Sequence, residues 1–234
     1  MNGAVFICFI IWPHLTNTIL FYKIINKKYV HLQPHRKPKM PNCRNSRIPI
    51  ITAGKVLLLI DWDNLFFRLF ERFGGEEIHL ETRIKKLLSW VKQDIGPLFG
   101  DYGFVFAPEH MAFVYQEMCA ENSLRLMVCP KRQLSTPKIN PKTGNIIKEE
   151  DTVDESIIWF AKTMISHPDF KFLCLVSGDS DFAPMLKELG ENGIMRALAV
   201  PTIDSLSRTK QFIGLADKHP ATQKKMLFRL DGKI

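Results

Sequence analysis

The stretch Leu175-Val-Ser-Gly-Asp-Ser-Asp-Phe-Ala-Pro184 decides how this chain folds. The apolar run from Phe170 to Val176 that leads into it is typical of a short buried strand, which a Ser-Gly turn ends. The residues from Phe182 to Gly190 then predict a helix. Asp179 and Asp181 therefore lie where a strand ends and a helix begins, and ligands bind at this edge of open α/β sheets. Two carboxylates on such a turn are suited to bind a hard divalent cation.

Two further acidic clusters lie at the ends of apolar elements. Lys55-Val-Leu-Leu-Leu-Ile60 predicts a second buried strand, and Asp61-Trp-Asp-Asn-Leu65 follows it directly. The cluster Glu149-Glu-Asp-Thr-Val-Asp-Glu155 opens a helical stretch that continues from Ser156 to Ile165. Three acidic sites of this kind favour one convergent metal site, which a single sequence does not demonstrate.

Strands and helices alternate along the rest of the chain. Further strands are predicted at Tyr102–Ala107, Leu124–Cys129 and Ile194–Val200, and further helices at Leu65–Phe73, Glu81–Asp94, Glu109–Glu121 and Ser205–Ala216. Alternation at this spacing indicates an α/β fold with parallel strands and right-handed crossovers. In the first of these helices, the spacing of Leu65, Phe66, Leu69, Phe70 and Phe73 predicts a face that packs in the core.

Three segments resemble the NYN domain family of the PIN-like nuclease superfamily. They are Ile60-Asp-Trp-Asp-Asn-Leu65, Thr152-Val-Asp154 and Val176-Ser-Gly-Asp-Ser-Asp-Phe182, in this order and at this spacing. The resemblance covers about residues 55 to 217. It implies a three-layer α/β sandwich, PIN-like or Rossmann-like, in which helices cover both faces of a central, mostly parallel sheet.

The resemblance also implies a set of catalytic and metal-binding residues: Asp61, Asp154, Asp179 and Asp181. These would bind Mg²⁺ or Mn²⁺. Asn64 matches the family's Asn and is expected to orient Asp61 or a substrate phosphate, and Ser177 to hydrogen-bond the turn or a phosphate. The chain departs from the family in one place. Relatives often carry a further acidic residue in the helix after Asp154, where this chain has the apolar Ile157-Ile-Trp-Phe160.

Structural roles compete with these assignments. Asp179 or Asp181 can cap the following helix, and Asp63 can complement the helix dipole. Trp62 fits either packing or base stacking, with packing favoured. The acids other than Asp154 in the 149–155 cluster fit a solvated charge run.

The polar segment from Lys131 to Ile147 is predicted to be a long loop before the Asp154 helix. With Lys148 it holds five basic residues: Lys131, Arg132, Lys138, Lys142 and Lys148. A loop of this length is either functional or mobile. It fits a flap that contacts substrate phosphates, with Lys148 as a substrate-binding residue, or a solvated connection without a role.

The net charge of +8 comes from the N-terminal part of the chain. Residues 1–55 hold nine Lys and Arg and no acidic residue, leaving 23 of the 32 basic residues against 24 acidic ones. Charge therefore gives no argument that the folded domain binds nucleic acid. The five scattered cysteines form no metal-binding or disulfide pattern and indicate a reducing, cytoplasmic setting.

Three domains are predicted: an extension at 1–50, a nuclease domain at 51–217 and a basic C-terminal tail at 218–234. The extension is apolar from Ala4 to Tyr22 with Pro13 near its centre, and Lys residues follow. It fits a membrane anchor that faces the cytoplasm, an arm, or a mis-assigned start with Met40 as the true one.

The favoured function is a metal-dependent endoribonuclease that hydrolyses phosphodiester bonds of single-stranded or structured RNA. A non-catalytic RNA-binding or scaffold module of the same fold is the alternative. Clustered acids argue against it, because unneutralised like charges cost stability. A phosphotransferase of the haloacid dehalogenase type fits Asp61 and Asp63 but not the later acids. Assembly into a homo-oligomer stays open.

Overall fold

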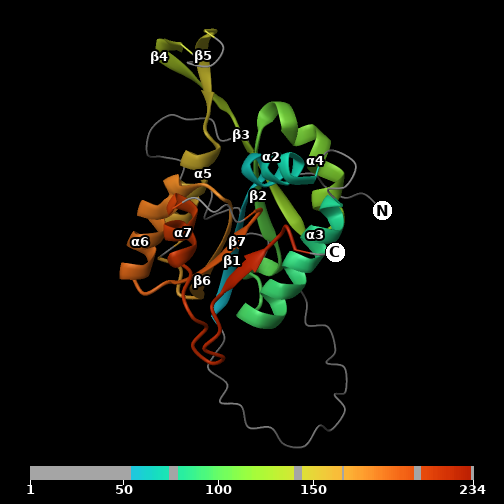
Figure 1. Cartoon of the computed structure of the whole chain (residues 1–234), viewed down its shortest axis with the longest axis vertical. Helices are drawn as coiled ribbons and strands as arrows, with labels where there is room; N and C mark the ends of the chain where they lie inside the picture. The colour runs from blue at the N-terminus through green and yellow to red at the C-terminus, as the bar shows by residue number, and fades with distance from the viewer. Residues whose placement is uncertain (1–53, 74–78, 140–143, 165, 203–206, 233–234) are drawn as a thin grey trace, which may run out of the picture. The chain divides into compact units, whose positions relative to one another are not determined.

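The computed structural model describes residues 54–73, 79–139, 144–164, 166–202 and 207–232. The predicted N-terminal extension lies outside these residues, and none of the described helices is long and apolar enough to cross a membrane. The main elements, shown in Figure 1, are β1 (Lys55–Asp61), α2 (Trp62–Phe73), α3 (Leu80–Trp90), β2 (Gly103–Pro108), α4 (Glu109–Glu121), β3 (Leu124–Cys129), β4 (Lys131–Ile139), β5 (Ile146–Asp151), α5 (Val153–Met164), β6 (Phe170–Val176), α6 (Ala183–Glu191), β7 (Met195–Val200), α7 (Ser207–Gly214) and β8 (Leu227–Arg229).

Six of the strands form one sheet in the order β3-β2-β1-β6-β7-β8, and every neighbouring pair is parallel. The α2, α3 and α4 helices lie on one side of this sheet and α5, α6 and α7 on the other (Figure 1). The predicted α/β sandwich is therefore confirmed. Parallel strands covered on both faces need apolar side chains on both, which explains the unbroken run in β1.

The two faces of β1 pack against different helices. Val56, Leu58 and Ile60 belong to a core that includes buried residues of α2, α3 and α4. On the other face, Phe160 of α5 packs its ring against Phe104 and Phe106 of β2. Helices therefore pack against both faces of the sheet at its centre.

The strand order reverses direction between β1 and β6. From β1 the chain adds β2 and β3 on one side and then returns to place β6 on the other, where Leu59 pairs with Leu175 and Ile60 with Val176. In open α/β sheets such a switch point leaves room for a ligand outside the carboxyl ends of the two strands. Asp61 and Ser177 are the residues that the sequence places there.

The predicted loop from Lys131 to Ile147 is wrong. Residues 131–139 and 146–151 form the antiparallel strands β4 and β5, which pair with each other and not with the main sheet. Most of their side chains are exposed. The pairing therefore left no alternating apolar pattern in the sequence, and Pro137 lies where the register is irregular. The antiparallel backbone ladder holds the hairpin together, and ion pairs between its side chains add to it.

The predicted C-terminal tail adds an edge to the sheet. β8 pairs with β7, and Met226 and Leu230 on either side of it are buried in the core. Asp217, where the tail begins, accepts hydrogen bonds from the backbone N–H of Arg196 at 2.8 Å and from its guanidinium at 2.9 and 2.6 Å. Burial opposes ionisation of Asp217, but these bonds prevail and hold its pKa below the usual value.

Replacing Asp217 by Ala is expected to lower the free energy of unfolding by about 2 kcal/mol, because charge-assisted hydrogen bonds at a partly buried site are lost. Urea denaturation would measure the change. The exposed pair of Arg68 and Glu71 provides a control, since Glu71→Ala should change stability by less than about 0.5 kcal/mol. Equal effects of the two substitutions would contradict a structural role for Asp217.

Candidate active site at the carboxyl edge of the sheet

Asp61 is a buried carboxylate at the end of β1, with 3% of its surface exposed. Its Oδ2 accepts a hydrogen bond from the Ser177 hydroxyl at 2.8 Å, and its Oδ1 accepts one from the backbone N–H of Asn64 at 3.3 Å. Burial raises the pKa of Asp61 to about 7 against the effect of these bonds, and the charges of Asp154 and Asp179 raise it further. An ionised Asp61 is therefore costly unless a cation lies nearby.

Hydrogen bonds join the end of β1 to the turn after β6. The fully buried Ser177 hydroxyl, which donates to Asp61, also accepts the N–H of Asp179 at 3.0 Å. The Asn64 side-chain oxygen accepts the N–H of Gly178 at 2.8 Å. A Cβ on residue 178 would lie 3.2 Å from that oxygen, so glycine permits this close approach. Ser177 and Asn64 thus fix the position of the turn that carries Asp179.

Asp179 caps the helical turn that follows β6. Its Oδ1 accepts the N–H of Asp181 at 2.8 Å, as the competing capping role predicts. The capping bond does not exclude a second role, because each carboxylate oxygen has two lone pairs. Asp181 is exposed at the start of the same turn.

Asp154, in the first turn of α5, lies within electrostatic range of the other predicted acids. Partial burial raises its pKa to about 6, and the charges of Asp179 and Asp181 contribute to the rise. The structure therefore brings together carboxylates from β1, from the turn after β6 and from α5. No salt bridge joins any of these four aspartates to a Lys or Arg in the described part of the chain.

Asp63 and His110 also lie at this edge. From the sequence, Asp63 was a weaker candidate ligand whose favoured role was to complement the helix dipole, and His110 was not predicted. Burial raises the pKa of Asp63, Asp151 raises it further, and His110 partly offsets the rise. Asp63 Oδ1 is buried without a hydrogen-bond partner among the described residues. Their positions in the sequence could have indicated this placement, because each lies two residues after the end of a strand, Asp63 after β1 and His110 after β2.

The carboxylate oxygens of the four aspartates are the type of ligand that a hard divalent cation prefers. No three His, Cys, Asp or Glu side chains within the described ranges lie close enough to hold one ion together. Mg²⁺ binds through one or two carboxylates and keeps several waters, so a complete protein cage is not needed. The raised pKa values of Asp61 and Asp154 also fit a site that becomes favourable once a cation balances its charge.

The same pKa values predict how stability depends on pH without metal. The folded pKa of Asp61, about 7, exceeds its unfolded value of 3.8, and that of Asp154 rises to about 6. The stability that their protonated forms contribute is present at low pH and is lost as the pH rises through these folded values. In EDTA, the thermal midpoint should fall by about 5 °C between pH 5.5 and pH 8.5. A midpoint that rises over this range would contradict the assignment of buried, unneutralised acids.

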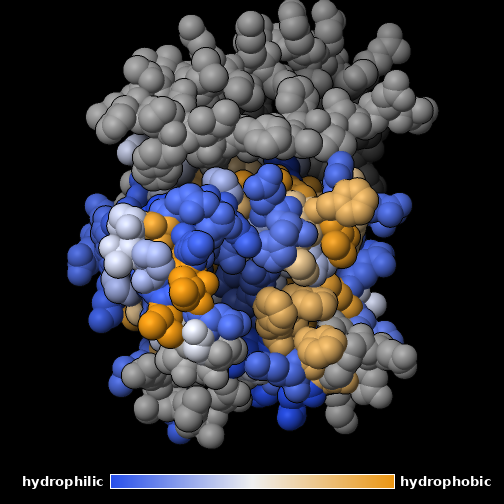
Figure 2. All heavy atoms as spheres, turned by 90° about the horizontal axis from the view of Figure 1, so that it is seen from above, coloured by the Kyte–Doolittle hydropathy of each residue, from blue (hydrophilic) through white to orange (hydrophobic). Residues whose placement is uncertain are grey.

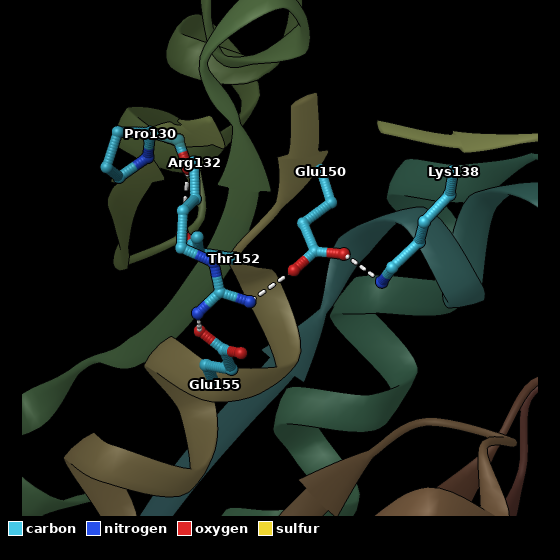
Figure 3. A network of polar contacts seen from close by, with 6 residues as sticks. All are labelled: Pro130, Arg132, Lys138, Glu150, Thr152 and Glu155. Carbon is cyan, nitrogen blue, oxygen red and sulfur yellow. Dashed lines mark hydrogen bonds and ion pairs between the residues drawn. The ribbon is translucent and has the colours of Figure 1, made fainter. Parts of the chain in front are cut away.

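The hairpin of β4 and β5 is tied to the start of α5 by a network of ion pairs (Figure 3). The Arg132 guanidinium contacts Glu155 of α5 at 2.8 Å and also Glu150 of β5, which accepts from Lys138 at 2.8 Å. Thr152 donates to the carbonyl of Pro130 at 2.7 Å. Most of the predicted solvated charge run is thus paired within the hairpin and its base.

Lys148, predicted to bind substrate, is exposed on β5, and no described contact joins it to the four aspartates. Trp62 is fully buried and lies 4.5 Å from Tyr115 between ring centroids, which confirms its packing role. Cys129 and Cys174 are buried free thiols, as expected for core residues.

The chain is an α/β protein whose parallel sheet carries carboxylates at the switch point between β1 and β6. The sequence profile of the NYN domain matches residues 55–216. The chain belongs to the NYN domain family, which has a PIN-like nuclease fold and whose members are generally nucleases that act on RNA.

Other comparisons support the fold and add no function. The crystal structure of a protein of unknown function from Vibrio parahaemolyticus matches 76% of this chain and 94% of its own, with a TM-score of 0.51 and 13% identity. At this identity the likeness shows the fold alone. No curated protein matches the chain.

Proposed function

We propose that this protein is a divalent-metal-dependent endoribonuclease. The convergence of Asp61, Asp154, Asp179 and Asp181 carries the proposal. Burial first, and the neighbouring acidic charges second, raise the pKa values of Asp61 and Asp154, and no described Lys or Arg forms a salt bridge with the four aspartates. Acids clustered in this way lower the stability of the fold. A divalent cation bound by both the acids and the phosphate of the substrate would balance their charge.

Each residue has a proposed role. Asp154, Asp179 and Asp181 are solvent-accessible or half-buried and would hold Mg²⁺ or Mn²⁺. The bound ion would lower the pKa of an attacking water and offset the charge of the phosphate. Asp61 would be the buried member of this group of ligands, and the Ser177 hydroxyl holds one of its oxygens by a hydrogen bond. Asn64 would position the turn that carries Asp179.

The direct test is cleavage of a labelled single-stranded RNA by the full chain with Mn²⁺, with Mg²⁺ and with EDTA. We expect internal cuts with either metal and none with EDTA. Equal cleavage in EDTA would refute metal dependence. Binding of RNA without cleavage, by protein shown to be folded, would favour the non-catalytic module instead.

Asn64→Ala is expected to lower the rate of cleavage about 10- to 100-fold, because residues that hold a metal ligand in place commonly have effects of this size. The N–H of Gly178 would lose its acceptor, and the turn would no longer be held against β1. Single-turnover rates at saturating metal would measure the effect. Asn122→Ala is the control, since Asn122 is a buried asparagine that donates to the carbonyl of Met118 at the end of α4. Similar losses from both substitutions would point to general destabilisation.

A further inference from the structure

Three phenylalanines on α2 form a continuous aromatic surface beside the acidic edge: Phe66, Phe67 and Phe70. Phe66 lies 5.8 Å from Phe67 and 6.1 Å from Phe70 between ring centroids. Phe67 is 54% exposed and Phe70 is 47% exposed, whereas Phe66 is partly buried against Tyr115 of α4. We call these three rings the α2 platform.

The core of the protein does not need the outer two rings. Trp62, Leu65 and Leu69 form the buried stripe of α2. The sequence analysis placed Phe70 in that stripe as well, and this prediction is wrong because its ring lies at the surface. Two large aromatic side chains half-exposed on one helix leave apolar area for a partner.

The platform lies on the helix that begins at the proposed active site. α2 begins directly after Asp61, and Asn64 lies in its first turn. At a rise of 1.5 Å per residue, Phe67 and Phe70 lie about 9 and 14 Å along the helix from Asp61. Figure 2 looks onto this end of the molecule from above and shows hydrophobic side chains grouped beside a hollow lined with hydrophilic ones. Exposed Arg68 and Arg72 on the same helix can contact phosphates.

We propose that the α2 platform is a stacking site for unpaired bases of the RNA strand whose phosphodiester lies at the acidic edge. This inference rests on the proposed function, because it takes the strand as the substrate. Aromatic rings stack on any base through its flat face and bind single strands with little sequence preference. Bases of a duplex are stacked within it and do not reach the platform, so the site selects unpaired RNA.

A second copy of the chain is the competing occupant. A symmetric contact through α2 would use the same surface on both copies. It would bring two acidic edges toward each other, and their like charges repel. An RNA strand can place its bases on the rings and a phosphate beside the exposed Arg72 of the same helix, and neither contact needs a metal ion.

The test uses the full chain in EDTA, so that binding is measured without turnover. The probe is a single-stranded uridine-rich RNA of twelve nucleotides with one 2-aminopurine, whose fluorescence is quenched on stacking and is high in the free, weakly stacked strand. Its position is moved along the strand in a series. We expect quenching at one or two positions, and about tenfold weaker binding with less quenching for Phe67→Ala or Phe70→Ala. The duplex form of the probe should show neither effect.

Three variants separate stacking from other causes. Phe67→Trp should retain binding and quenching, whereas Phe67→Leu should lose both, because leucine is apolar without a flat face. Phe113→Ala is the matched control: Phe113 on α4 is 86% exposed and makes no ring contact with α2 among the described residues. Its replacement should change nothing.

Equal binding by Phe67→Leu and the parent chain would overturn the stacking site. So would sedimentation showing a dimer that Phe67→Ala dissociates. The proposed function fails separately: base stacking in EDTA without cleavage in Mn²⁺ would retain the platform and remove the nuclease. Mn²⁺-dependent cleavage that does not change when Phe67 or Phe70 is replaced would support the nuclease and argue against the platform.

Discussion

Replacing Asp179 by Asn is expected to lower Mn²⁺-dependent RNA cleavage by about 100-fold or more, because stabilisation of transition-state charge by a metal is worth several kcal/mol. The amide keeps the size of the carboxylate and remains a good helix cap, so the bond to the N–H of Asp181 can persist. The loss should therefore come without unfolding. Single-turnover cleavage and a thermal melt of the same preparation would measure both.

The matched control for this variant is Asp169→Asn. Asp169 lies just before β6 and Asp179 just after it, so the two acids mark opposite edges of the sheet on one strand. Asp169 is exposed, and its carboxylate lies 3.7 Å from the Lys55 amine. Its replacement should leave cleavage unchanged. Full activity of Asp179→Asn would remove Asp179 from the metal site.

Asp61→Asn is expected to move activity and stability in opposite directions. Cleavage should fall about 100-fold, because the set of charged ligands loses its buried member. In EDTA at pH 8, the thermal midpoint should rise by about 5 °C, since a neutral amide avoids the cost of an ionised, buried carboxylate. Asn can still accept the bond from Ser177 or Asn64 through its side-chain oxygen.

The sign of the stability change has an internal check. Asp61 has a folded pKa of about 7, so it is largely protonated at pH 5.5 and the advantage of Asn should shrink there. Addition of Mn²⁺ at pH 8 should stabilise the parent chain more than the variant. A variant that melts below the parent at pH 8 in EDTA would show that the hydrogen bonds of Asp61 outweigh its burial.

The strands of the main sheet could be predicted because buried parallel strands require unbroken apolar runs. The ranges predicted for β3 and β6 agree with the structure, and the turn after β6 carries Asp179 as expected. The adjacency of Asp61 and Ser177 could not be derived from the residues alone, since it depends on which strands pair. The family resemblance implied that Asp61 and the turn at Ser177 belong to one site, but it did not predict the hydrogen bond between them.

Other features left no signal in the pattern. β4 and β5 pair through their backbones while their side chains stay mostly exposed and charged, so the segment has the composition of a loop. Phe70 has the spacing of a core residue, but its ring points away from the buried stripe of Leu65 and Leu69. His110 follows a strand end like the aspartates do, but a single histidine near a proline predicts nothing by itself.

The pairing of β1 with β6 has a consequence for synthesis of the chain. The hydrogen bond from Ser177 to Asp61 closes across 116 positions in sequence, and the long-range pairing of these strands must precede it. Contacts between residues this far apart in sequence have a large loop-closure cost and slow folding. A nascent chain that has released β1, α2 and β2 from the ribosome therefore carries Asp61 but no assembled acidic site. The acidic site is therefore assembled only after β6 has emerged and paired with β1.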